Sequence, residues 1–262
     1  MRLTIAILTL LLTPLSLLAQ DAKPLKALLI TGGCCHDYEN QKKILTEGIS
    51  ARANVTWTIV HEGEGEKKGG TNHKISIYEK DDWAKGYDVV VHNECFADVN
   101  DVPFVERVAK AHHDGVAGVV IHCTMHTFRG AKTDEWRKFL GVTSTSHERS
   151  RPELVKNLQP AHPIMKGFPL EWKTPNGELY IISKVGPDTT PLAQAFGPDT
   201  KKDHPVIWTN QYGKARVFGT TLGHHNETMA HENYLNFVSR GLLWACDKLD
   251  DNGNPKAGYG RK

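Results

Sequence analysis

Beyond its first twenty residues, this chain of 262 residues lacks any apolar run long enough to cross a membrane, a span that takes about 20 residues. It also lacks an excess of charge of one sign, since 32 Lys and Arg stand against 30 Asp and Glu, and the basic residues are scattered. Proteins that bind nucleic acid usually gather their basic residues into a patch or stripe. We therefore expect no membrane span in the mature chain and no nucleic-acid partner.

Cysteine is scarce, and its pattern excludes two further classes of protein. There are five cysteines, and neither a CxxC pair nor the HExxH motif of zinc proteases is present. An odd number of cysteines does not suit an exported scaffold of disulfides. A bridge between the neighbours Cys34 and Cys35 would be strained, so we expect none. Cys95 and Cys123 lie in apolar strand patterns and are expected to be free, buried thiols.

The N-terminal residues have the pattern of a cleavable secretory signal. A positive start at Arg2 is followed by a short apolar run that Pro14 interrupts. An uncleaved membrane anchor is the alternative, but the proline and the shortness of the run argue against it. The mature protein should then be periplasmic or secreted. We expect a signal peptide over residues 1–20, one domain over residues 21–249, and a disordered, polar tail over residues 250–262.

The rest of the chain alternates between apolar strand patterns and amphipathic helix patterns. Such alternation, with continuous apolar strands, is typical of a parallel sheet that is covered by helices on both faces. Later strand patterns follow each other without helices, so extra strands are expected in the C-terminal part. The strands are predicted over residues 25–33, 55–60, 87–92, 115–122, 179–182, 190–195, 205–209 and 215–221, and the helices over 40–52, 103–113 and 234–246.

Histidine is abundant, with fourteen residues, and several histidines stand where predicted strands end. In an open parallel sheet, ligands bind beyond the carboxyl ends of the strands. We therefore expect four separate segments to bring histidines to one edge of the sheet. His112 and His113, in contrast, lie on a predicted helix and are expected at the surface. The strand-end histidines are His36, His92, His122 with His126, and His224.

Three kinds of chemistry suit these residues. Cys123, at a strand-to-helix turn, could be a nucleophile with a histidine such as His224 as its base, although the glycines of a nucleophile elbow are absent. His122 and His126, together with His36, His92 or His224, could bind Zn²⁺ or a similar divalent ion. The same histidines could instead serve in acid/base catalysis or polar recognition. Glu94, Arg129, Glu178 and Glu227 are the charged residues that could assist them.

An ordered series of short motifs resembles the ThuA-like (trehalose utilisation) family. It covers roughly residues 25–249 and includes the Gly-Gly turn before His36, the strand ending at His122, the segment 162–169, Glu178-Leu179-Tyr180, the segments 204–208 and 212–218, and Leu222-Gly223-His224. The resemblance implies a flavodoxin-like fold of the class I glutamine amidotransferase type. It also implies that His122 takes the place of the amidotransferase cysteine, so that glutamine amidotransferase activity is not expected. Because the family is associated with disaccharide metabolism, the implied substrate is a disaccharide or a keto-glycoside.

Our leading hypothesis is an exported carbohydrate enzyme, a hydrolase or lyase, that uses histidine acid/base or metal-assisted chemistry. The alternatives are a non-catalytic sugar-binding module, in which Trp208 and Trp172 would stack on sugars, and a hydrolase that depends on Cys123. The expected catalytic residues are His122, His224, His36 and Glu178. The expected substrate-binding residues are His92, Glu94, His126, Arg129 and Trp208, and the expected metal ligands, for a divalent ion such as zinc, are His122, His126 and His224.

Overall fold

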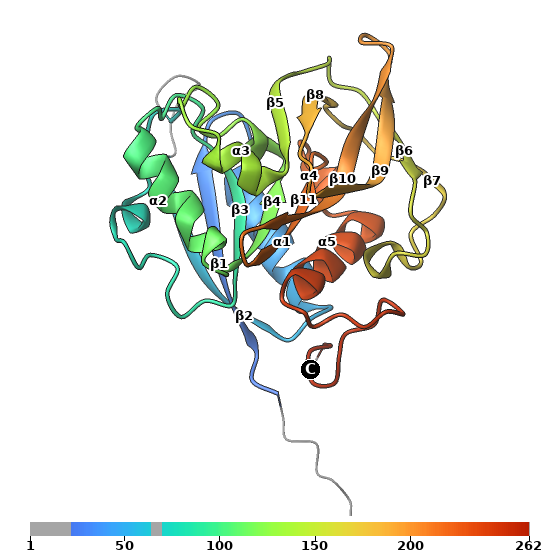
Figure 1. Cartoon of the computed structure of the whole chain (residues 1–262). Helices are drawn as coiled ribbons and strands as arrows, with labels where there is room; N and C mark the ends of the chain where they lie inside the picture. Colours follow the sequence, from blue (N-terminus) through green and yellow to red (C-terminus); the bar gives the residue numbers. More distant parts are fainter. Residues whose placement is uncertain (1–21, 64–69, 262) are drawn as a thin grey trace, which may run out of the picture.

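The computed structural model describes residues 22–63 and 70–261 (Figure 1). The predicted signal peptide, residues 1–20, lies outside the described residues. None of the helices in the described part is long and apolar enough to span a bilayer.

A mixed sheet of nine strands forms the centre of the protein, in the order β2-β1-β3-β4-β11-β10-β9-β6-β7. The first five strands in this order run parallel to each other, and the remaining four are joined by antiparallel pairing. The parallel strands are β1 (Leu25–Gly33), β2 (Val55–Glu62), β3 (Val89–Cys95), β4 (Ala117–Ile121) and β11 (Ala215–Thr220). The antiparallel strands are β6 (Leu154–Asn157), β7 (Glu171–Lys173), β9 (Thr189–Gly197) and β10 (Lys202–Tyr212).

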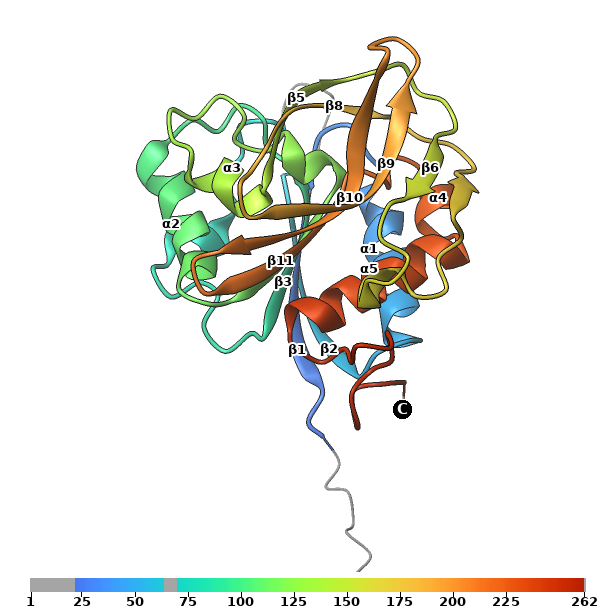
Figure 2. The same cartoon turned by 45° about the vertical axis from the view of Figure 1, so that its right-hand side comes forward.

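Helices cover both faces of the parallel half, as the sequence predicted (Figure 2). Helices α1 (Tyr38–Ser50) and α5 (Glu232–Ala245) pack together on one face, and α2 (Val102–His113) and α3 (Glu135–Leu140) pack together on the other. Each pair encloses its own apolar core against the sheet. Helix α1 begins two residues earlier than expected because the Asp37 side chain accepts a hydrogen bond from the backbone N–H of Asn40 and caps the helix.

All eight predicted strands and all three predicted helices are present, with shifted ends. The sequence analysis missed α3, β6 and β7, and it missed β5 (Val142–His147), which pairs with β8 (Tyr180–Val185) in a separate two-stranded sheet. The short elements that complete the fold are the helix α4 (Asn226–Met229) and the 3₁₀ helices η1 (Ser76–Glu79), η2 (His122–Met125) and η3 (Pro163–Met165).

Two predictions about the periphery are wrong. The tail over residues 250–261 is ordered, because it turns back onto the domain: Leu249 bridges to Pro255, and the Asn54 N–H donates to the Tyr259 carbonyl. His112 is fully buried rather than at the surface. It follows Val108 by one helical turn and so lies on the apolar face of α2 that packs against the sheet.

Candidate functional site

His122 lies at the turn that follows strand β4. Strand β4 ends at Ile121, and His122, the first residue of η2, adopts a left-handed backbone conformation with φ of +42°. A residue other than glycine rarely adopts this conformation, and such outliers gather at functional sites because the surrounding structure must hold them there. The turn leaves the His122 side chain buried at the carboxyl end of β4.

Glycines bring two further histidines to the same place. Gly33, at the end of β1 and with φ of +95°, passes so close to Cys95 that a Cβ atom would collide with the Cys95 carbonyl oxygen. His36 follows this turn. Gly223, with φ of +116°, ends the segment after β11 and places His224 next to His36. Only glycine adopts these backbone angles without strain.

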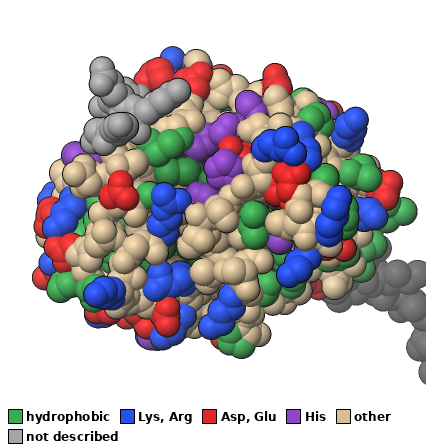
Figure 3. Space-filling model, turned by 90° about the horizontal axis from the view of Figure 1, so that it is seen from above, with side chains coloured by type: hydrophobic (Ala, Val, Ile, Leu, Met, Phe, Trp, Pro, Cys, Tyr) green, Lys and Arg blue, Asp and Glu red, His purple; other side chains and the backbone are tan. Residues whose placement is uncertain are grey.

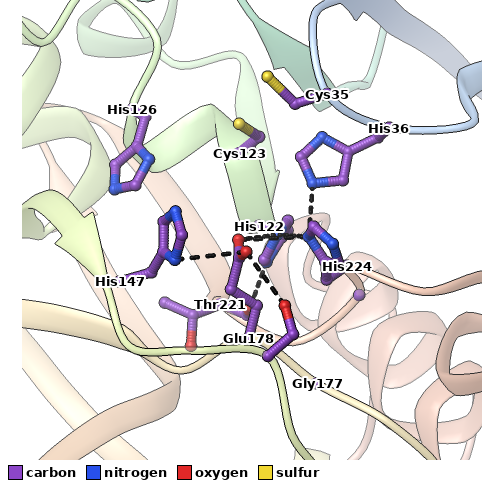
Figure 4. A network of polar contacts seen from close by, with 12 residues as sticks. Cys35, His36, His122, Cys123, His126, His147, Gly177, Glu178, Thr221 and His224 are labelled. Carbon is purple, nitrogen blue, oxygen red and sulfur yellow. Dashed lines mark hydrogen bonds and ion pairs between the residues drawn. The ribbon is translucent and has the colours of Figure 1, made fainter. Parts of the chain in front are cut away.

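Glu178 completes the group from the loop before β8. Its backbone N–H donates to Glu153 Oε1 over 3.0 Å, which anchors the loop to a buried carboxyl. Burial raises the pKa of Glu153 to about 8. Both carboxyl-bearing residues are buried, and the Glu178 carboxylate points toward His122 and His224 (Figure 4). His36, His122, His224 and Glu178, which we call the rim cluster, each offer an atom within 4.8 Å of the others.

The contacts of the rim cluster converge on one nitrogen atom, His224 Nδ1 (Figure 4). His36 Nε2 lies 2.9 Å from it, His122 Nε2 lies 3.2 Å from it, and Glu178 Oε2 lies 3.2 Å from it. Glu178 Oε2 is also 3.6 Å from His122 Nε2. The other carboxylate oxygen, Oε1, points outward and lies 3.3 Å from Nδ1 of the exposed His147.

Hydrogen bonds on the far sides of the rings decide which nitrogens carry protons. His122 Nδ1 lies 2.6 Å from the Thr221 carbonyl oxygen, which can only accept, so this nitrogen carries the proton. The Tyr38 hydroxyl donates to the Cys34 carbonyl and therefore accepts from His36 Nδ1 over 3.2 Å. The Nε2 atoms of His122 and His36 are consequently unprotonated, with their lone pairs directed toward His224.

Burial keeps both of these imidazoles neutral. Desolvation lowers the pKa of His36 well below its usual value, and the neighbouring His122 and His224 lower it further. Desolvation also lowers the pKa of His122. For Glu178, burial acts to raise the pKa, but the adjacent His122 and His224 outweigh it and hold the pKa of the carboxyl below its usual range. The rim cluster is thus a set of neutral nitrogens around an ionised carboxylate.

A cavity of about 220 Å³ opens over the rim cluster, and histidine side chains gather at this face of the molecule (Figure 3). His126, Arg129, His147 and Tyr180 also line this cavity. The His126 ring stacks on Tyr180 with the ring centres 4.1 Å apart, and burial lowers the pKa of His126 to about 3. The walls therefore offer an aromatic surface and polar groups to a small ligand.

The structure brings together some of the expected site residues and separates others. His36, His122, His224 and Glu178 form the rim cluster, while His126 and Arg129 line the cavity without joining it. His92 and Glu94 are fully buried beneath α2 and α3, where they contact Tyr78 and His112. We call these four residues the inner cluster. A substrate in the cavity cannot reach His92 or Glu94.

The two tryptophans expected as stacking platforms are core residues. Trp208 is fully buried, and its indole N–H donates to the Leu140 carbonyl over 2.8 Å. Trp172 packs in the core against Phe168. His147 and Tyr38 were not among the expected site residues. Tyr38 could have been predicted, since it follows His36 by two residues at the start of a helix pattern. His147 could not, because it ends a polar strand without the apolar alternation that predicts a strand.

The predictions for four cysteines are also wrong. Cys34 is joined to Cys35, and Cys95 is joined to Cys123, so that Cys246 is the free cysteine of the described chain. The left-handed conformation of Cys35, with φ of +84°, allows neighbouring cysteines to meet. With its sulfur bonded to Cys95, Cys123 is not a free nucleophile, which removes the support for a thiol-dependent hydrolase.

The parallel sheet and the helices on its two faces give the chain a glutamine amidotransferase-like α/β fold. A protein from Thermoplasma acidophilum that is described as part of a GMP synthase shares this fold, with a TM-score of 0.51 and 13% identity over 86% of this chain and 94% of that one. A ThuA-like protein from Parabacteroides merdae is more similar, with a TM-score of 0.65 and 21% identity over 92% of this chain and 98% of that one.

A second ThuA-like protein, from Bacteroides uniformis, matches with a TM-score of 0.64 and 17% identity over 90% of this chain and 98% of its own. A search of curated protein sequences finds no match. The family model of ThuA, described as trehalose utilisation, matches residues 26–245. The chain therefore belongs to the ThuA family.

Proposed function

We propose that the rim cluster binds one divalent transition-metal ion of the zinc class and that the protein uses it on a carbohydrate, either a disaccharide or a keto-glycoside. The observation that carries the proposal is the surplus of acceptors. His36 Nε2, His122 Nε2 and Glu178 Oε2 all face His224 Nδ1, which has at most one proton to donate. Buried acceptors without donors are costly, and a cation satisfies all of them at once.

The supporting contacts are those that metal-binding histidines usually have. Such histidines donate their second ring N–H to a carbonyl or another acceptor, which fixes the ring and its tautomer. His122 does this to the Thr221 carbonyl and His36 to the Tyr38 hydroxyl. Three imidazoles with an adjacent carboxylate are donors that suit zinc and its neighbours in the first transition row.

Glu178 suits a role in proton transfer. Its Oε2 atom contacts the histidines, and its Oε1 atom contacts His147, which is exposed at the mouth of the cavity. The carboxylate thus connects the buried cluster to solvent. When bound, the metal ion would polarise a carbonyl or hydroxyl oxygen of the sugar. Glu178 would accept the proton that is released, with its Oε1 atom beside His147 Nδ1, which carries a proton because it lies 2.8 Å from the Glu148 carbonyl oxygen.

A sugar as the ligand is supported by the family description, trehalose utilisation, and by the polar and aromatic walls of a cavity small enough to enclose about one sugar ring. The signal-like pattern of residues 1–20 supports export, so we also propose that the protein acts outside the cytoplasm.

The test is the metal content of the purified mature chain, measured by elemental analysis after loading with Zn²⁺ and removal of the excess. We expect close to one ion per chain in the wild type and little in His36→Ala, His122→Ala or His224→Ala. His126→Ala is the matched control, because His126 lines the same cavity outside the rim cluster, and it should keep its metal.

Equal zinc in the wild type and all three rim variants would overturn the proposed metal site. Loss of zinc in His126→Ala but not in His36→Ala would restore the ligand set that the sequence suggested. The loaded protein should then be assayed for release of free sugar from disaccharides and 3-keto-glycosides. In this assay Glu178→Gln should be inactive while keeping more zinc than the histidine variants.

A further inference from the structure

Four cysteine sulfurs lie together beside the rim cluster, and the proposed function does not use them. They form two disulfides, Cys34–Cys35 and Cys95–Cys123, which come from the carboxyl ends of β1, β3 and β4. Cys35 immediately precedes His36, and Cys123 immediately follows His122 (Figure 4). All four cysteines line the cavity.

The two disulfides are in contact. Cys34 Sγ lies 3.7 Å from Cys95 Sγ, close to the distance at which a sulfur can attack its neighbour. Cys34, Cys95 and Cys123 are at most 6% exposed and form a small apolar cluster with Tyr38. Cys35, in contrast, is exposed. Cys35 is therefore the most accessible of the four sulfurs to an external thiol, and Cys34 is the sulfur that contacts the buried Cys95–Cys123 bond.

We propose that these cysteines form a thiol–disulfide relay, in which the exposed Cys34–Cys35 pair passes two electrons from an external dithiol to the buried Cys95–Cys123 disulfide. Disulfides exchange by attack of a thiolate on a disulfide sulfur, so accessibility and proximity decide which bonds can react. The relay needs neither the metal nor the sugar, and it is independent of the function proposed above.

Each step of the relay conserves atoms and electrons. A thiolate of the external dithiol attacks Cys35 Sγ, the Cys34–Cys35 bond breaks, and Cys34 leaves as a thiolate. The second thiol of the reductant then attacks the mixed disulfide, which releases Cys35 and the oxidised reductant. Cys34 attacks Cys95 Sγ, and Cys123 leaves and takes up a proton. Cys35 finally attacks Cys34 Sγ, which reforms the Cys34–Cys35 bond and releases Cys95 as a second thiol.

The experiment follows the opening of the buried disulfide in the mature chain carrying Cys246→Ser, so that the four relay cysteines are the only ones left. Dithiothreitol is the probe, and a chelator is present to exclude metal. Samples are quenched with acid and alkylated, and the peptides that contain Cys95 and Cys123 are quantified by mass spectrometry. We expect thiols at these positions to appear at least tenfold faster with the Cys34–Cys35 pair than in Cys34→Ser/Cys35→Ser. Equal rates would overturn the relay.

A second variant tests the contact between Cys34 and Cys95 without reductant and guards against a change of fold in the double variant. Cys35→Ser leaves Cys34 as a buried thiol with no partner in sequence. Non-reducing peptide maps should then show a Cys34–Cys95 link with Cys123 free. Maps in which Cys95 remains linked only to Cys123, with Cys34 fully alkylated, would contradict the proposed route.

Discussion

The protein contains two groups of histidines around a carboxyl, and their hydrogen bonds differ in one decisive respect. In the inner cluster, the proton on His112 Nδ1 is donated to the Val116 carbonyl over 2.8 Å, so His112 Nε2 accepts from His92 Nε2 over 3.0 Å. His92 Nδ1 must then accept from Glu94 Oε1, 2.8 Å away. Each proton of the inner cluster then has one acceptor, provided that Glu94 carries a proton on Oε1.

The electrostatics of the inner cluster agree with this assignment. Burial raises the pKa of Glu94 well above its usual value and lowers the pKa of His92 to about 3. The inner cluster is therefore a neutral network in which each proton has an acceptor, while the buried Glu94 Oε2 atom has no hydrogen-bond partner. The rim cluster has the opposite character, because several acceptors share one donor and a cavity lies beside them. The placement of protons, and not the number of histidines, therefore separates a ligand site from a structural network.

The largest expected effect is a loss of metal affinity. It should follow a change in the rim cluster but not a change in the inner cluster. His122→Ala removes one of three imidazole donors, so the affinity for Zn²⁺ should fall by more than about a hundredfold, beyond what loss of a supporting hydrogen bond usually causes. His92→Ala should leave the affinity unchanged, because His92 is fully buried away from the rim cluster. Competition with a fluorescent chelator measures both. A comparable loss in His92→Ala would mean that the two clusters are not independent.

The second largest effect is expected on stability. A change in the inner cluster should destabilise the protein more than a change at the cavity. His92→Ala opens a cavity and leaves Glu94 and His112 without their shared partner, which should lower the free energy of unfolding by about 3 kcal/mol. His147→Ala, at the exposed mouth of the cavity, should cost less than about 1 kcal/mol. Urea unfolding of the metal-free proteins gives both values. A small loss in His92→Ala would show that the inner cluster adds little to the core.

The dependence of stability on pH tests the protonation of Glu94 directly. In the unfolded chain Glu94 loses its proton above about pH 4.5, whereas the folded chain retains it because burial raises its pKa. Folding therefore loses up to about 1.4 kcal/mol of stability from this group for each pH unit above that value. Glu94→Gln has no proton to lose, so its stability relative to the wild type should rise between pH 5 and pH 7. A difference that does not change with pH would mean that folded Glu94 is ionised.

The same two clusters show how much of the fold and the site could be predicted from the sequence. Apolar runs and glycine turns predicted the parallel strands, and they placed His36, His122 and His224 at one edge because the strands end together. They could not separate His92 from these residues. A parallel strand is buried on both faces, so its apolar pattern carries no mark of which side chains point to the cavity. His92 precedes the end of β3 and faces the core of α2 and α3.

The turn at His122 was likewise beyond prediction, since a positive φ at a residue other than glycine depends on the packing around it. His147 was missed because β5 is polar along most of its length and pairs only with β8. The Cys95–Cys123 bond and the contact of Cys34 with Cys95 depend on the same three strand ends meeting, so the spacing of these residues along the chain does not predict them.

The smallest effect compares two buried tyrosines that occupy matching places in the two clusters. Tyr38 accepts the proton of His36 Nδ1 and so holds the His36 lone pair toward the rim cluster, whereas the Tyr78 hydroxyl donates to Glu94 Oε1 over 3.2 Å. Tyr38→Phe should weaken Zn²⁺ binding by about tenfold, the usual result of losing such a support. Tyr78→Phe should leave metal binding unchanged and lower stability by about 1 kcal/mol. If both variants bind Zn²⁺ as tightly as the wild type, the His36 tautomer is not set by Tyr38, and the surplus of acceptors in the rim cluster then rests on His122 and Glu178 alone.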